Sequence, residues 1–270
     1  MNKHSGFTLV ELLVSLGLLG VILTTLFQTM GSTTQLANTT NSSNDLIREG
    51  QIAQQVLNAR FKEACYVYPA NKSIQLAASG YTTKNGIGSP VGSNWVINTH
   101  PMVAMILPPS ADIPATLTVN NYRFVAYYAI PRSQYVAASP AGAANVINPG
   151  PDVLNDSVVW MLMEYRQNIN VLAAGFGLVT TCAAVAANTS TVLTGGNAEL
   201  LTDFITPVTT STQLFNVGPE RPDGSASFVE YNLRLQKTTR GNGTTNTITV
   251  GGGASGTTLT AKVYPVNLGL

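Results

Sequence analysis

A single carboxylate, Glu11, interrupts an otherwise apolar run close to the N-terminus. Residues 7–27 read FTLVELLVSLGLLGVILTTLF, and as a helix they would span about 30 Å, the thickness of a bilayer core. Inserting an acid near one end of such a span costs roughly 2–3 kcal/mol, and less at the interface. Because an ionisable residue in a membrane span usually has a function and a partner, Glu11 is the first residue expected to carry chemistry.

Two ordinary explanations of this apolar segment fit the residues poorly. A secretory signal usually has a shorter apolar core, and the sequence Thr29-Met30-Gly31 that follows does not form a small-x-small cleavage site. A plain membrane anchor explains the length of the segment but leaves Glu11 without a purpose. Lys3 and His4 precede the run, so the short N-terminal end is expected to stay cytoplasmic and the rest of the chain to lie outside.

A third explanation accounts for the order of the residues as well as the length. The string Gly6-Phe7-Thr8-Leu9-Val10-Glu11 resembles the class III leader of type IV prepilins and pseudopilins. In that family a membrane peptidase cuts after the glycine and methylates the new terminal phenylalanine. The acid then occupies the fifth mature position and pairs with the free amine of a neighbouring subunit.

The resemblance implies a role for each of these residues. Residues 1–6 would be a cleaved leader, Phe7 the methylated N-terminus, and Glu11 the acid that aligns subunits. The implied partners are prepilin peptidase, other pilin or pseudopilin subunits, and the inner membrane with its assembly platform. An ion pair is physically reasonable there, since opposite charges in lipid attract strongly and offset each other's burial cost.

A long helix must carry this N-terminal site. Residues 7–27 are predicted to be the transmembrane part and residues 28–65 the soluble part, with Pro69 as the terminator. The polar stretch that follows Phe27 is a poor helix former, and a kink or restart is plausible at the N-cap residues 42–45. Apolar and small residues then recur every three or four positions and predict a stripe packed on a head domain: Leu46, Gly50, Ala53, Leu57, Phe61 and Ala64.

Residues 66–270 are predicted to form a β-rich globular head, which makes the fold α+β and pilin-like. The clearest strand is Phe228–Lys237, where apolar and polar residues alternate. Further strands are expected at 101–107, 121–130 and 157–165, whereas 200–208 could be a short helix or a strand. Two more segments, 244–250 and 257–263, flank Gly251–Gly253 and predict a hairpin.

The head shows a looser likeness to particular subfamilies. The chain resembles the larger PilW-type minor pilins and the J-type pseudopilins of type II secretion, in its length and in four short segments: Phe124–Tyr128, Leu200–Phe204, Val229–Leu235 and Lys262–Pro265. Gln28 stands near the place where the commonest major pilins carry a proline, which also favours a minor pilin or pseudopilin.

Composition limits the partners of the chain as a whole. Charged residues make up only 10%, against roughly 25% in an average soluble protein, and the net charge is +1. No nucleic-acid or acidic partner is therefore expected for the chain overall. The two cysteines, Cys65 and Cys182, could form one disulfide in an oxidising compartment or remain two separate buried thiols.

Few residues of the sequence indicate catalytic or ligand-binding chemistry. The histidines are His4 and His100, no metal-ligand spacing is present, and neither a phosphate loop nor a serine elbow occurs. We therefore expect no metal, no cofactor and no enzyme, with a membrane-anchored exported enzyme as the remote alternative. Three scattered acids are expected to be solvated or capping, with calcium binding as a weaker alternative: Asp152, Asp156 and Asp203.

Four basic residues near the C-terminus form the remaining candidate site: Arg234, Lys237, Arg240 and Lys262. They make either a positive surface without a ligand or a weak, salt-sensitive DNA contact. DNA contact is suggested only by the resemblance, because some pilin-like filaments serve DNA uptake.

The expected function is structural. The subunit would sit in the inner membrane with a periplasmic head before assembly. It would then enter a type IV pilus-like filament, or its tip, for adhesion, motility or DNA uptake. The alternative is a J-type pseudopilin of a type II secretion system.

Overall fold

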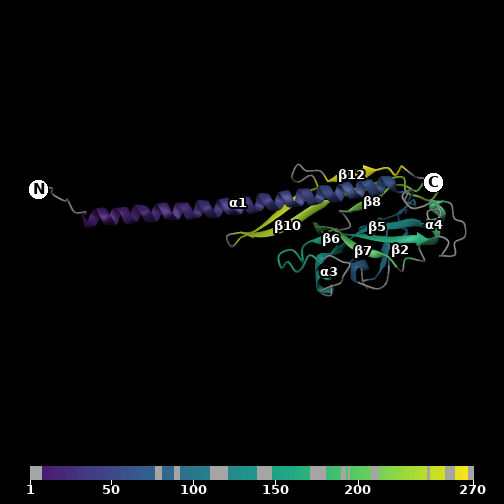
Figure 1. Ribbon diagram of the computed structural model, residues 1–270, viewed down its shortest axis with the longest axis horizontal. Helices are drawn as coiled ribbons and strands as arrows, with labels where there is room; N and C mark the ends of the chain where they lie inside the picture. The colour runs from purple at the N-terminus through teal and green to yellow at the C-terminus, as the bar shows by residue number, and fades with distance from the viewer. Residues whose placement is uncertain are drawn as a thin grey trace.

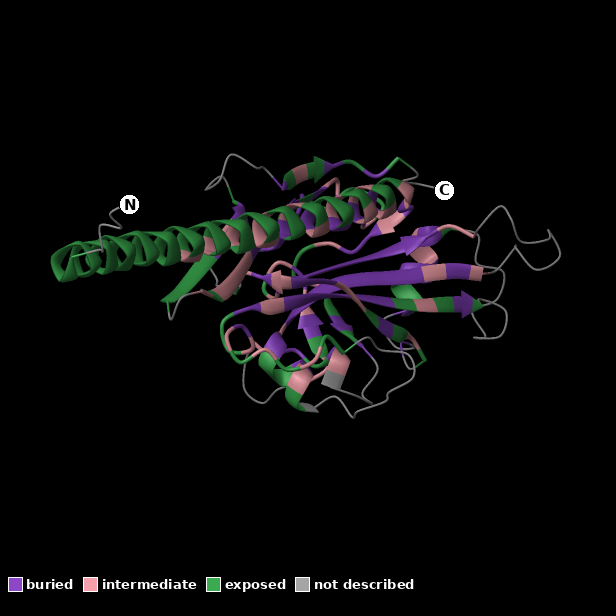
Figure 2. Ribbon diagram, turned by 60° about the vertical axis from the view of Figure 1, so that its left-hand side comes forward, coloured by how far each residue is buried: buried purple, intermediate pink, exposed green. Residues whose placement is uncertain are grey.

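A helical stem projects from a β-rich head (Figure 1). The computed structural model describes residues 8–76, 81–87, 92–109, 121–138, 148–170, 181–189, 193, 195–207, 213–241, 244–252 and 259–266. The stem is helix α1, Leu9–Glu63, whose 55 residues extend about 82 Å. Its N-terminal half is exposed, whereas its C-terminal half lies along the head (Figure 2).

The stem is one unbroken helix, so the kink expected at residues 42–45 is wrong. Several threonine side chains in the polar stretch donate to a carbonyl one turn earlier, as Thr39 does to Gln35 at 2.9 Å. These hydroxyls are therefore satisfied within the helix, which continues without interruption through residues 42–45. Strands β10 (Arg234–Gly241) and β11 (Thr244–Gly251) contact the same helix, and such tertiary packing outweighs the poor propensity of the segment.

The stem also ends differently from the prediction. Helix α1 stops at Glu63, six residues before Pro69, and Ala64 adopts an extended conformation. The Cys65 N–H donates to the Ile106 carbonyl at 3.0 Å, and the next residues pair with a neighbouring strand. Entry into the sheet therefore ends the helix, and the proline is not its terminator.

The head is built on a seven-stranded antiparallel sheet in the order β1-β4-β5-β6-β7-β10-β11. Its strands are β1 (Tyr66–Val67), β4 (Met102–Leu107), β5 (Asn121–Pro131), β6 (Trp160–Asn170), β7 (Asn197–Ile205), β10 (Arg234–Gly241) and β11 (Thr244–Gly251). A three-stranded sheet joins β12 (Thr260–Val263), β9 (Val229–Asn232) and β8 (Phe215–Val217), and β2 (Ser73–Gln75) pairs with β3 (Asn94–Val96). The short helices are η1 (Tyr81–Thr83), α3 (Arg132–Ala138) and α4 (Cys182–Thr189).

This architecture confirms the α+β pilin-like fold and several of its strands. Strands β4 and β5 match the segments expected at 101–107 and 121–130, and β7 shows that the ambiguous segment 200–208 enters a strand. Strand β6 begins at Trp160, three residues later than expected, and continues five residues further, to Asn170.

Two predictions about the C-terminal strands are wrong. Segment 228–237 is not one strand, because the chain passes from the small sheet to the large one at Leu233, whose N–H donates to the Leu259 carbonyl. Strands β11 and β12 do not form a hairpin either, since β11 pairs with β10 and β12 pairs with β9. Residues 253–258, which run from the end of the expected turn into the second expected strand, lie outside the described residues.

The predicted stem stripe lies in the core. Leu46, Ala53, Leu57 and Phe61 are buried, together with Gly50 and the C-cap Ala64. The Phe61 ring lies 5.8 Å from the ring of Tyr231 and 6.0 Å from that of Tyr127, so one stem residue touches both sheets. Helix α1 therefore packs against both the seven-stranded and the three-stranded sheet.

Candidate functional site

Glu11 lies in the first turn of the stem and caps it. Its carboxylate accepts hydrogen bonds from the Thr8 N–H at 3.0 Å and the Thr8 hydroxyl at 2.9 Å, and the Thr8 oxygen accepts from the Glu11 N–H. This reciprocal arrangement is a capping box. The T-x-x-E pattern before an apolar run is the known signal of such a box, and it could have predicted this one from the sequence. Gly6 and Phe7 lie outside the described residues.

The stem following Glu11 offers a continuous apolar surface. Every residue of the segment 9–30, about 33 Å of helix, is exposed. By its length and composition this helix could cross a membrane. Its exposed apolar side chains include Leu9, Val10, Leu12, Leu13, Leu16, Leu18, Val21, Ile22, Leu26, Phe27 and Met30. A surface of this size would be unfavourable in water and calls for lipid or other apolar helices.

The head covers the stem from Gly31 onward. Gly31 is the first partly covered stem residue, and Gln35 and Thr39 continue the covered face. The hairpin of β10 and β11 lies alongside this part and reaches further toward the N-terminus than the rest of the head (Figure 1). Gly241, at the end of β10, approaches the stem so closely that a Cβ there would lie 3.3 Å from Gln35 Cγ. The free part of the stem is therefore close to the thickness of a bilayer core.

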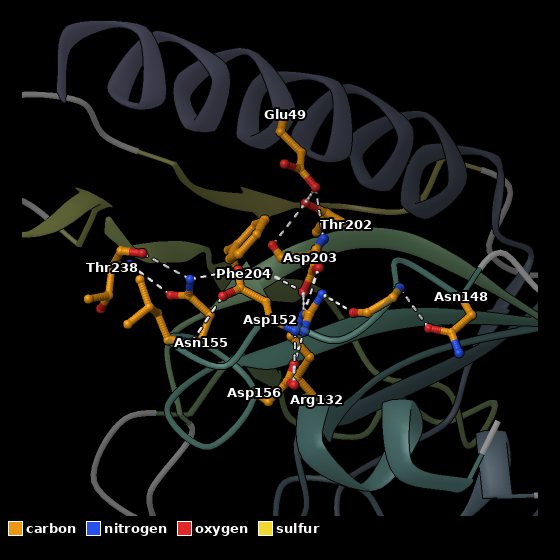
Figure 3. Close-up of polar contacts among 12 residues, drawn as sticks. Glu49, Arg132, Asn148, Asp152, Asn155, Asp156, Thr202, Asp203, Phe204 and Thr238 are labelled. Atoms are coloured by element: carbon orange, nitrogen blue, oxygen red, sulfur yellow. Dashed lines mark hydrogen bonds and ion pairs between the residues drawn. The ribbon is translucent and has the colours of Figure 1, made fainter. Parts of the chain in front are cut away.

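A buried ionic cluster lies beneath the stem (Figure 3). The side chain of Arg132, at the start of α3, is only 2% exposed. Its Nε donates to both carboxylate oxygens of Asp203 at 3.0 and 3.2 Å, and its Nη2 donates to the Gly150 carbonyl at 2.9 Å. Its Nη1 also pairs with Asp156. Asp203 is therefore a buried ion-pair partner, and the expectation that it is solvated or capping is wrong.

Glu49 connects this cluster to the stem. One Glu49 carboxylate oxygen accepts from the Thr202 hydroxyl at 2.9 Å and from the Asp203 N–H at 2.8 Å (Figure 3). The next residue, Phe204, has a φ of 60°, and its N–H donates to the Asp203 carboxylate at 2.7 Å. A non-glycine residue in the left-handed region is strained, and the surrounding contacts must hold it. The cluster therefore adds a polar contact between stem and head to the apolar packing of the buried stripe.

Glu49→Ala is expected to lower the free energy of unfolding by about 1–3 kcal/mol, because it leaves the Thr202 hydroxyl and the Asp203 N–H without their acceptor. Chemical denaturation followed by tryptophan fluorescence measures the effect. Glu49→Gln is the matched control, since its amide oxygen can still accept both bonds and should retain most of the stability. Equal losses in the two variants would mean that the charge of Glu49, and not its acceptor role, is what matters.

The four basic candidates are not gathered into one patch. Arg234 and Arg240 are exposed and share one face of β10, whereas Lys237 is on the other face by strand alternation. The Lys237 Nζ lies 4.7 Å from the centre of the Phe204 ring. Lys262 belongs to β12 in the smaller sheet, and its Nζ lies 3.6 Å from the centre of the Phe228 ring. Two of the four charges are thus engaged with aromatic rings.

The cysteines are joined in the structure. Cys65, immediately after the stem, forms a disulfide with Cys182 at the start of α4, and the two Cα atoms are 5.9 Å apart. Both residues are buried. The bond connects the base of the stem to a helix 117 residues further along the chain.

Within the described residues, no group of three or more His, Cys, Asp or Glu side chains could hold a metal ion. Burial lowers the pKa of His100, and its Nδ1 accepts from the Val96 N–H at 2.8 Å, as a neutral imidazole does. This histidine therefore has a structural partner in a turn of the head.

The fold and the N-terminal site together define a class: a subunit with an apolar membrane stem and a β-rich head. Residues 1–27 match the family model described as the prokaryotic N-terminal methylation motif. The chain is thus a type IV prepilin- or pseudopilin-like protein, and the resemblance predicted from Gly6, Phe7 and Glu11 is confirmed at this level. Neither the curated proteins nor the solved structures include a significant match to it.

Proposed function

We propose that this protein is a structural minor pilin or pseudopilin subunit that assembles into, or at the tip of, a type IV pilus-like filament. The observation that carries the proposal is the exposed apolar stem, residues 9–30, which overlaps the methylation motif matched at residues 1–27 and stands clear of the head. The subunit would first be held in the inner membrane by this segment, with its head in the periplasm. On assembly, its apolar stem would leave the lipid and pack against the stems of neighbouring subunits.

The proposed order of events assigns each N-terminal residue a task. Prepilin peptidase removes residues 1–6 and methylates Phe7, and the assembly platform then brings the stem beside others. The Glu11 carboxylate pairs with the amine of a neighbouring subunit in a medium of low dielectric constant. The unbroken helix through Gln28 also favours a minor pilin or pseudopilin, because a proline-type break is absent from this part of the stem.

Leader processing gives the most direct test. Gly6→Leu is expected to block cleavage, because the family's peptidase cuts after a glycine and a bulky side chain would occupy that position. Mass spectrometry of the wild-type protein from membranes should find a methylated Phe7 as its N-terminus, and the variant should keep residues 1–6. Assembled wild-type protein that retained Met1 would overturn the proposal.

A further inference from the structure

A polar groove crosses the three-stranded sheet of β8, β9 and β12. Its volume is about 480 Å³, within the range of roughly 300–1,000 Å³ typical of small-molecule sites. It is lined by Gln213, Leu214, Asn216, Glu230, Tyr231, Asn232 and Thr260. The groove lies far along the chain from the N-terminal motif, and the proposed function does not use it.

Strand alternation explains why this face is polar. The rings of Phe215 and Tyr231 point toward the stem and lie 6.4 and 5.8 Å from the ring of Phe61. Their strand neighbours Asn216 and Glu230 therefore point to the opposite face, where both are exposed. The inner face of the sheet packs on the stem, whereas the outer face is exposed and accessible to a ligand.

Two polar side chains of the groove already have partners: Gln213 donates to the Asn98 carbonyl at 2.8 Å, and the Tyr231 hydroxyl donates to Asn58 at 2.8 Å on the inner side. Within the described parts of the chain, the structure gives no side-chain hydrogen bond to Asn216, Glu230, Asn232 or Thr260. Lys262 is directly opposite Glu230 in the β9–β12 pairing, yet its Nζ lies over the Phe228 ring. The Glu230 carboxylate is thus left as an open acceptor beside two amides and a hydroxyl.

We infer that this groove binds a neutral glycan. The hydroxyls of a sugar ring both donate and accept, and the amides of Asn216 and Asn232 and the hydroxyl of Thr260 can do the same. The carboxylate of Glu230 can accept from two adjacent hydroxyls, and hydrogen bonds to a charged acceptor are the stronger kind. A polyanion is disfavoured, because Glu230 is the charged side chain among the lining residues. The ligand class is therefore uncharged and rich in hydroxyls.

A glycan array probed with the full-length protein tests this inference. The protein is held in lipid nanodiscs, since a detergent with a sugar headgroup could occupy the groove. Binding to at least one neutral glycan is expected, with no preference for sialylated or sulfated ones. Glu230→Ala and Asn232→Ala should each raise the Kd for that glycan at least tenfold. Asn246→Ala, an exposed amide on β11, is the matched control and should leave the Kd unchanged.

Three outcomes would overturn the inference: no neutral glycan bound above empty nanodiscs, unchanged affinity in Glu230→Ala, or binding restricted to a cationic probe such as spermidine. Because the substituted residues are at exposed strand positions, circular dichroism of each variant should match the wild type. The result does not depend on filament assembly, so it is separate from the test of leader processing.

Discussion

Glu11→Val is expected to abolish incorporation into filaments while leader cleavage and membrane insertion continue. In a lone membrane anchor the carboxylate only adds an insertion cost of roughly 2–3 kcal/mol, so its removal would leave the protein at least as well inserted. In a filament subunit the same removal leaves the amine of a neighbouring Phe7 buried without its partner. One substitution thus has opposite consequences for the two kinds of protein.

The capping box provides a second explanation of Glu11, which the experiment must separate from the first. Glu11 accepts from the N–H and hydroxyl of Thr8, and loss of such a cap costs a helix about 0.5–2 kcal/mol. Glu11→Gln is the matched variant, because glutamine also serves in a capping box but carries no charge. If assembly needs the ion pair, Glu11→Gln should fail as completely as Glu11→Val.

The measurement compares membrane content, the mass of the processed N-terminus and the amount in sheared filaments for the wild type and both variants. If Glu11→Gln enters filaments normally and Glu11→Val does not, Glu11 acts in helix capping alone. Normal incorporation of both variants would show that the acid does not align subunits, even if the leader is cleaved as proposed.

The N-terminal motif and the buried face of the stem could be predicted from sequence because their determinants are local. The order of Gly6, Phe7 and Glu11 and the spacing from Leu46 to Phe61 are visible within a few helical turns. The kink expected at residues 42–45 was wrong for a non-local reason, since the packing of β10 and β11 on the stem is not encoded in the segment itself.

The head was harder to predict because its pairings join distant residues. Apolar and polar residues alternate along segment 228–237 as in one strand. The segment nevertheless leaves the small sheet and enters the large one at Leu233, whose N–H donates to the Leu259 carbonyl. The ion pair of Arg132 and Asp203 joins residues 71 positions apart. No local sequence pattern around either residue predicts that its side chain is buried. Such contacts depend on topology, which the alternation of apolar residues does not specify.

Loss of the disulfide is expected to produce the largest loss of stability in the head. In the chain-entropy model a cross-link closing a loop of about 100 residues contributes about 4.7 kcal/mol, and removal of native disulfides typically costs 2–5 kcal/mol. The Cys65–Cys182 bond closes a loop of similar length, with a sequence separation of 117. The bond also holds α4, whose Val185 and Ala186 belong to the core, against the base of the stem.

The double variant Cys65→Ala/Cys182→Ala should therefore unfold at a lower denaturant concentration, with a loss of about 2–5 kcal/mol. The fluorescence of Trp95, which is fully buried, follows the transition. Reduced wild-type protein is the matched control and should unfold with the variant, because both lack the same cross-link. Peptide mapping of the exported protein without reductant should find one linked pair. Two alkylatable thiols, or a wild type whose stability does not change on reduction, would contradict a stabilising bridge between the stem and α4.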